Sequence, residues 1–117
     1  MNFDETLEFS KDFKRLSKKY RSLSGDLLEF KKVILKSPLG TGRSFAVLMS
    51  EEDIKIIKAR LFCRYLKGSS LRNIYAYCES RKRIEFIQVY FKDDSGREDR
   101  ERIRSYLDDL KYGMNHR

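Results

Sequence analysis

The chain of 117 residues lacks most of the features that mark multidomain, secreted or membrane proteins. It has one proline, no low-complexity run and no long Gly/Ser linker, so we expect a single domain spanning residues 1–117. No stretch approaches the roughly 20 apolar residues of a membrane-spanning helix. The N-terminal segment "MNFDETLEF" is acidic and has no apolar centre, which argues against a signal peptide. These absences predict a cytoplasmic protein that makes no contact with a membrane.

The chain is equally poor in the residues that build metal sites and catalytic triads. Its two cysteines, Cys63 and Cys78, are too few for a disulfide framework, and we expect them as reduced, buried or half-buried thiols. The single histidine, His116, is second from the C-terminus, where chains fray, and no Cys/His or Ser/His/Asp set accompanies it. The stretch "GTGR" (40–43) lacks the lysine and the helix of a phosphate-binding loop. We expect no metal and no small-molecule cofactor.

Positive charge is what the chain has in excess. There are 26 Lys and Arg against 18 Asp and Glu, a net charge of +8 that favours polyanionic partners such as RNA, DNA or an acidic protein. Residues 55–92 carry ten Lys and Arg against two glutamates, whereas residues 93–111 carry five against seven acidic residues. The excess therefore belongs to the middle of the chain and to residues 11–36, and not to the C-terminal end.

Hydrophobic periodicity predicts an α+β protein with the element order β-α-α-β-β-β-β-α. The expected elements are a strand in 2–9, helices at 11–20 and 22–37, strands at 44–49, 54–65, 71–79 and 83–92, and a helix at 95–113. Ser10 is the expected N-cap of the first helix, and Ser95 with Glu98 forms a capping-box pattern for the last. Short links between the last three strands predict hairpins. The predicted sheet is antiparallel with about four to five strands, and the two-helix hairpin covers one face.

Alternation along these strands predicts which side chains share a face. We place Arg64 opposite Arg72 across the first hairpin, and Tyr90 opposite Arg72 across the second. The apolar face, expected to meet the helices, holds Ile57, Ala59, Leu61, Cys63, Tyr75, Tyr77, Ile87, Val89 and Phe91, and Glu79 and Glu85 also fall on it. The exposed face holds Lys58, Arg60, Arg64, Arg72 and Lys92, with the rings of Phe62, Phe86 and Tyr90.

A face of cations and aromatic rings has two interpretations. Long basic side chains can simply keep a sheet face soluble. Alternatively, the cations hold phosphates and the rings stack on bases, as in proteins that bind single-stranded nucleic acid. Arginines that face each other destabilise a strand pair, and a phosphate between them would reverse that effect. The absence of acidic residues from this face favours the second interpretation.

Among reactions on nucleic acids, one needs neither histidine nor metal. RNA cleavage by its own 2′-hydroxyl requires a base, an acid and cations that stabilise the charge developing on the phosphate. Lysine or tyrosine can serve as base or acid when neighbouring cations lower the pKa. A magnesium nuclease would need carboxylates in the basic groove, and the predicted groove has none.

Three segments resemble the RelE/ParE toxin superfamily, and in particular its RelE-like members. They are "FSKDFKRLSKKY", "KARLFCRYLKGSSLRNIYAY" and "RIEFIQVYFKDDSGREDRERI". The pattern R-x-I-Y at Arg72–Tyr75, and "YFK" followed by an "ED" helix start, are similar to that branch. The resemblance covers about residues 7–110 and implies a single RelE-like toxin domain.

The resemblance implies a toxin of a type II toxin–antitoxin system. RelE-like toxins cut mRNA in the ribosomal A site by 2′-hydroxyl attack without metal, and a cognate antitoxin wraps and blocks them. The basic residues of their central strands match Lys58, Arg60, Arg64 and Arg72, with Tyr90 and Lys92 at the end of the last strand. We expect Lys58 to be the base, the three arginines to bind phosphate and transition-state charge, and Tyr90 to stack or act as the acid. Because fold alone does not separate activities, a ParE-like gyrase inhibitor or a relative that only binds RNA or antitoxin remains the alternative.

Overall fold

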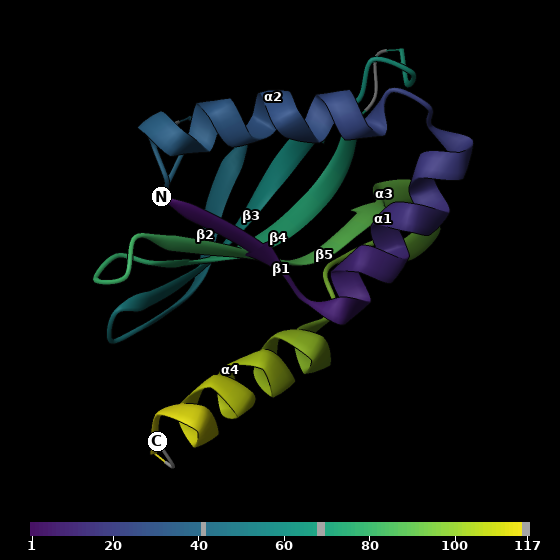
Figure 1. Cartoon of the computed structure of the whole chain (residues 1–117). Coiled ribbons are helices and arrows are strands. Elements are labelled where there is room, and N and C mark those ends of the chain that lie inside the picture. The colour runs from purple at the N-terminus through teal and green to yellow at the C-terminus, as the bar shows by residue number, and fades with distance from the viewer. Residues whose placement is uncertain (41, 68–69, 116–117) are drawn as a thin grey trace.

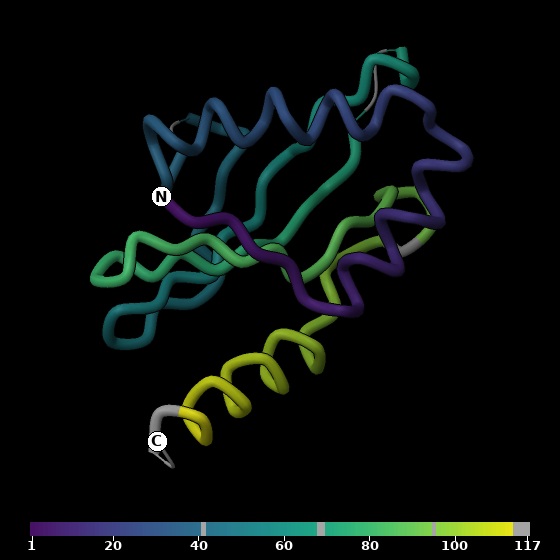
Figure 2. Tube along the Cα trace, viewed as in Figure 1, coloured from purple at the N-terminus to yellow at the C-terminus, as the bar shows by residue number. Residues whose placement is uncertain are grey.

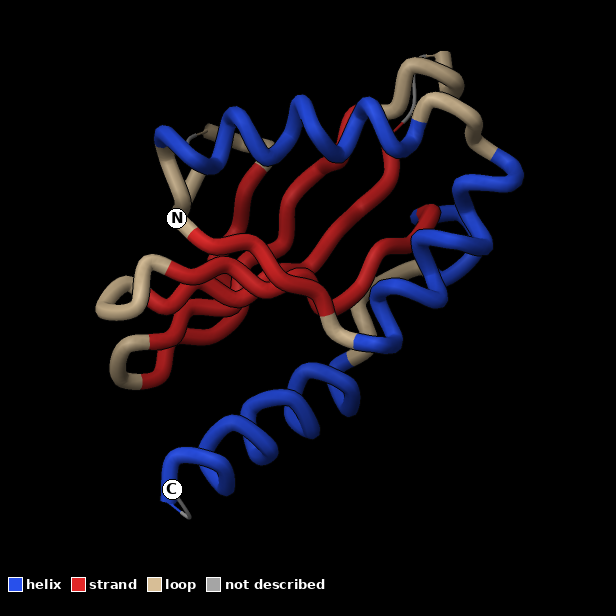
Figure 3. The backbone as a smooth tube through the Cα atoms, in the orientation of Figure 1, coloured by secondary structure: helices blue, strands red, loops and turns tan. Residues whose placement is uncertain are grey.

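The computed structural model describes residues 1–40, 42–67 and 70–115, so the predictions for His116 and for part of the "GTGR" loop lie outside it. Helices and strands of the described residues are coloured in Figure 3. In chain order they are β1 (Asn2–Glu5), α1 (Leu7–Lys19), α2 (Leu23–Lys36), β2 (Phe45–Glu51), β3 (Ile54–Phe62), β4 (Ser70–Cys78), β5 (Arg83–Phe91), α3 (Lys92–Ser95) and α4 (Arg100–Asn115). The predicted order is confirmed, with the one-turn helix α3 as an addition.

The strands form one five-stranded sheet in the order β1-β5-β4-β3-β2. Strands β2 to β5 pair antiparallel, as predicted, and β1 runs parallel to β5, so the sheet is mixed. Helices α1 and α2 lie on one side of the sheet and α4 lies on the other (Figure 1). The turns of the β2–β3 and β4–β5 hairpins lie side by side at one end of the sheet (Figure 2), where the Ser80 N–H donates to the Asp53 carboxylate at 3.2 Å.

The first helix begins earlier than its sequence predicted. Strand β1 ends at Glu5, and the Thr6 hydroxyl accepts a hydrogen bond from the Phe9 N–H at 3.1 Å, which makes Thr6 the N-cap of α1. Ser10, the predicted cap, lies inside the first turn and donates to the Glu5 carboxylate at 2.8 Å. Thr6 and Ser10 are both good capping residues, and the pairing of β1 with β5 decides between them.

Both faces of the sheet are covered by apolar side chains. The larger core lies under α1 and α2 and is rich in rings, such as Phe9 and Phe86 with centroids 5.3 Å apart. The smaller core lies under α4, where Ile103 and Leu107 pack on Ile74 and Ala76. Cys63 is buried and Cys78 is half-buried, and both are free thiols as expected. The face predicted to be exposed is therefore partly buried by the C-terminal helix.

A bulge in the β4–β5 hairpin changes the predicted faces. Arg72 pairs with Tyr90 as predicted, but the register shifts between Ile74 and Tyr75, so that Tyr75 pairs with Phe86. The prediction for Phe86 is therefore wrong, because the bulge turns its ring into the core under α1 and α2. The predictions for Ile87 and Glu85 are wrong for the same reason: both were expected on the apolar face under α1 and α2, and both lie on the α4 side.

The first hairpin has the predicted faces but a different register. Arg60, and not Arg64, pairs with Arg72, and Phe62 pairs with Ser70. A shift of four residues keeps every side chain on its face, because the side-chain period of a strand is two. The prediction that Arg64 lies opposite Arg72 is wrong, since β3 ends at Phe62 and Arg64 lies in the turn that follows.

Candidate nucleic-acid interface

One end of the sheet face that carries α4 is open, and cations from two strands meet there. Residues two apart on a strand share a face, so Lys58 and Arg60 lie on the same side of β3 as Ile56, which packs under α4. Arg72 joins them from β4, directly opposite Arg60. These side chains line a cleft of about 300 Å³. Its charged lining, among the residues described, is Arg43, Lys58, Arg60, Arg72 and Arg100 with the single carboxylate Glu98.

The two facing arginines, Arg60 and Arg72, are the feature of this cleft that most favours binding of an anion. Arg60 is exposed, while Arg72 is half-buried and donates to the Ser70 hydroxyl at 2.8 Å. Like charges directly opposite each other on paired strands repel. An anion bound between the two guanidinium groups would convert that repulsion into attraction, because guanidinium donors match phosphate oxygens in geometry and charge.

Glu98 lies in this cleft, although the sequence pattern did not place it there. Its oxygens bind Lys58 Nζ at 3.0 Å and the Arg100 guanidinium at 2.8 Å, and its side chain is 5% exposed. Burial alone would raise the pKa of Glu98. The hydrogen bond from Lys58, a backbone hydrogen bond and the charges of Lys58 and Arg100 outweigh burial and lower it. The prediction that the basic groove contains no carboxylate is wrong.

The last long helix begins later than the Ser95–Glu98 capping-box pattern predicts. Asp99 takes the N-cap position, since its carboxylate accepts from the Arg102 N–H at 3.0 Å and α4 begins at Arg100. Glu98 is therefore free to turn into the cleft. The only signal in the sequence is that Asp99 is as good an N-cap as Ser95 and stands closer to the apolar stripe that begins at Ile103.

Tyr90 lies beside this ion pair with its hydroxyl buried. The residue is 5% exposed, and the hydroxyl lies near Lys58 without a hydrogen bond of normal geometry to any described residue. Burial raises the pKa of Tyr90, the charge of Glu98 adds to this rise, and the charges of Lys58 and Arg72 oppose it. The ring offers no open face for a base to stack on, but a neutral phenol in this position can donate a proton or a hydrogen bond.

The remaining predicted site residues lie elsewhere. Arg64 extends over α2 and pairs with Asp26 at 3.3 Å, where the absence of a side chain at Gly25 leaves room for its guanidinium. Phe62 is 66% exposed at the end of β3, and its ring is available for stacking. Lys92 is exposed in α3 and does not line the cleft. The structure thus brings together Lys58, Arg60, Arg72 and Tyr90, and separates from them Arg64, Phe86 and Lys92.

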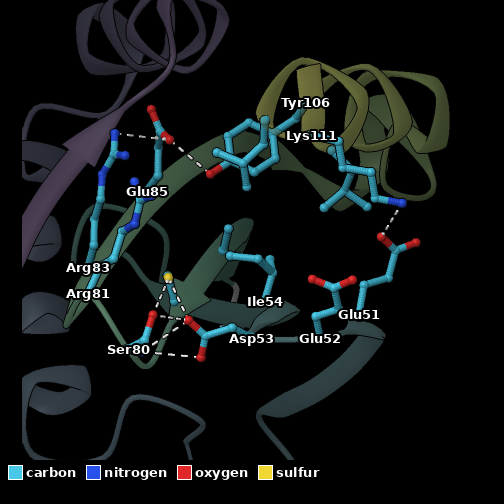
Figure 4. A pocket seen from close by; sticks show the side chains of 14 residues that line it. Glu51, Glu52, Asp53, Ile54, Ser80, Arg81, Arg83, Glu85, Tyr106 and Lys111 are labelled. Atoms are coloured by element: carbon cyan, nitrogen blue, oxygen red, sulfur yellow. Dashed lines mark hydrogen bonds and ion pairs between the residues drawn. The ribbon is translucent and has the colours of Figure 1, made fainter. Parts of the chain in front are cut away.

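A second cavity, of about 450 Å³, lies between α4 and the hairpin turns (Figure 4). Some of its charges are paired across the cavity: Lys111 binds Glu51 at 2.9 Å, and Arg83 binds Glu85 at 3.3 Å (Figure 4). Glu85 also accepts from the Tyr106 hydroxyl at 2.8 Å. Burial, reinforced by Glu85, raises the pKa of Tyr106. Because four carboxylates line it beside three cations, this cavity does not attract a polyanion as the basic cleft does.

The described residues also bear on metal binding and on membrane insertion. No group of three or more His, Cys, Asp or Glu side chains among them is arranged to hold a metal ion. No helix in the same part of the chain is both long and apolar enough to cross a membrane.

Comparison with known proteins shows what the fold is. No family model and no curated protein sequence matches the chain. Among solved structures, it is similar to RelE in the crystal structure of the archaeal RelE–RelB complex from Pyrococcus horikoshii OT3. The TM-score is 0.59 at 20% identity, over 78% of this chain and 93% of that chain. The chain therefore has a RelE-like α+β fold, which confirms the fold expected from the resemblance.

Proposed function

We propose that this protein is the toxin of a toxin–antitoxin pair and acts as a ribosome-dependent mRNA endoribonuclease. The RelE-like fold supports the toxin assignment, and the structural neighbour is a complex with RelB, which supports a cognate antitoxin as partner. The observation that carries the nuclease assignment is the pair of facing arginines, Arg60 and Arg72, in a cleft with Lys58. Because translating ribosomes are cytoplasmic, the proposed substrate implies that the protein acts in the cytoplasm.

The cleft supplies what 2′-hydroxyl attack on the neighbouring phosphate requires. Arg60 and Arg72 neutralise the phosphate and stabilise the charge that develops on its oxygens in the transition state. Lys58 adds a third cation, and Tyr90 places a neutral hydroxyl beside it. Phe62 offers an exposed ring to an mRNA base outside the cleft. All of these groups belong to the protein, so the mechanism invokes no metal ion.

The test is induction in growing bacterial cells with mapping of mRNA 5′ ends. Wild-type protein should stop translation and leave new 5′ ends inside translated reading frames. The Arg72→Ala variant should lower cleavage by about 100-fold, because it removes one of the two guanidinium groups that face the phosphate. Arg104→Ala is the matched control, since Arg104 is an exposed arginine of α4 that does not line the cleft.

Three results would contradict the proposal. Arrested growth with intact transcripts excludes the nuclease assignment, and an accompanying DNA-damage response indicates a gyrase inhibitor. Binding of RNA with a steep salt dependence but no cleavage on ribosomes indicates a protein that only binds. An Arg72→Ala variant that stays folded and fully toxic excludes the cleft as the active site.

A further inference from the structure

The contact between Glu98 and Lys58 constrains the chemistry of the cleft. The Glu98 carboxylate is almost fully buried, and each of its oxygens binds a cation, Lys58 or Arg100. Lys58 is 31% exposed and reaches the cleft from the sheet floor. In such a pair the lysine is an ammonium, which has protons to give and no lone pair to accept one.

Glu98 is held by its neighbours in the chain and does not depend on Lys58 for its position. The N–H of Asp99 donates to the Gln88 side-chain oxygen at 2.8 Å, which ties the segment before α4 to β5. Arg102 binds the Asp12 carboxylate at 2.6 Å and the Ile87 carbonyl at 3.1 Å. The sheet and α1 therefore fix the carboxylate, and the carboxylate in turn fixes the flexible lysine side chain.

We propose that Glu98 is a positioning residue that keeps Lys58 in place as an ammonium, so that Lys58 serves RNA cleavage as a cation and proton donor and not as the base. The proposal rests on the endoribonuclease function and assigns Lys58 a role opposite to the one expected from the sequence. Glu98 itself does not touch the RNA, because both of its oxygens are occupied and its side chain is buried.

The cleavage step then balances as follows. The 2′-oxygen forms a bond to phosphorus while the bond from phosphorus to the 5′-oxygen breaks, which leaves a 2′,3′-cyclic phosphate. The 2′-hydroxyl gives its proton to solvent water. The leaving 5′-oxygen takes a proton from the Lys58 ammonium, and Lys58 then regains a proton from solvent.

The charged groups around Lys58 predict the effect of removing the Glu98 carboxylate. The groups that face it are Arg43, Arg60, Arg72, Tyr90, Glu98 and Arg100. Glu98 is the only anion among them, so Glu98→Gln leaves Lys58 among cations and a neutral phenol. Neighbouring cations favour the neutral amine of a lysine. The ammonium of Lys58 should therefore be lost at a lower pH in this variant.

The experiment measures single-turnover cleavage of mRNA on programmed ribosomes across a range of pH. If Lys58 must be an ammonium, Glu98→Gln lowers the maximal single-turnover rate at neutral pH by about tenfold. It leaves the ribosome concentration for half-maximal rate unchanged and moves the alkaline fall in rate to lower pH. If Lys58 is the base, the same variant has more free amine and cleaves faster at neutral pH. A rate equal to or above that of wild type overturns the proposal.

Two further variants make the test decisive. Glu51→Gln also removes a negative charge that pairs with a lysine, Lys111, but at the second cavity, and it should leave the pH profile unchanged. Lys58→Arg keeps a cation that stays protonated and therefore has no lone pair to accept a proton, so it should cleave about tenfold faster than Lys58→Ala if Lys58 acts as a cation. Equal rates for these two variants overturn the proposal even if Glu98→Gln does not fold. A wild-type protein that cleaves no RNA contradicts the proposed function instead.

Discussion

Asp26 and Glu98 are both buried carboxylates, one on α2 and one before α4, on opposite sides of the sheet. Asp26 accepts from the Ser22 hydroxyl at 2.6 Å and from the backbone N–H of Arg64 at 3.2 Å, and it pairs with the Arg64 side chain. The Arg64 side chain is 68% exposed and is the only cation that binds Asp26 in the described structure.

Glu98 has partners of a different kind. Two of them are side-chain cations, and one of these, Lys58, lies in a cleft with further arginines. Because both carboxylates are buried, burial alone does not distinguish Glu98 from Asp26, and the difference lies in their partners. Asp26 satisfies the backbone of the turn after β3 and thereby holds that turn against α2, whereas Glu98 pairs with a lysine that faces a cleft lined by arginines.

The largest difference between the two carboxylates should appear in stability. Asp26→Ala should lower the free energy of unfolding by about 3 kcal/mol, because it removes three hydrogen bonds and leaves the Arg64 N–H without its acceptor. Glu98→Ala should cost only about 1 kcal/mol, because Lys58 and Arg100 can turn into water. Urea unfolding of both variants measures this, and equal losses would remove the distinction.

Acid should reveal the ion pair of Glu98. A carboxylate whose pKa is lower in the folded state stabilises the protein at higher pH, and this contribution is lost as the pH falls through its folded value. The pKa of Glu98 lies below its ordinary value of 4.5. The stability advantage of wild type over Glu98→Gln should therefore shrink below about pH 4.5. Unfolding curves of both proteins at neutral and acid pH test this, and a constant difference would contradict it.

The smallest effect is expected at Arg64. Arg64→Ala should lower the free energy of unfolding by about 0.5 kcal/mol, because an ion pair with one exposed partner contributes little and the backbone hydrogen bond to Asp26 remains. Its rate of mRNA cleavage should stay within about twofold of wild type, in contrast to Arg72→Ala. A loss of cleavage as large as that of Arg72→Ala would return Arg64 to the active site.

Much of the architecture could be predicted because it depends on local patterns. Apolar spacing at Phe13, Leu16 and Tyr20 predicts a helix, and period-two alternation from residue 54 predicts strands. The same alternation places Lys58, Arg60 and Arg72 on one face, which the structure confirms through the Arg60–Arg72 pair. The assignment of strand side chains to faces does not change when the strand register shifts by an even number of residues.

Tertiary structure decided what alternation leaves open. The bulge near Ile74 moves Phe86 into the core, and the turn after β3 carries Arg64 to α2, because strand pairing and packing against helices set the register. The sequence by itself determined that cations lie on one face of a sheet. Only the packing of α4 determined that Glu98 lies among them, since two good N-caps compete locally and long-range contacts with Gln88 and Asp12 select Asp99.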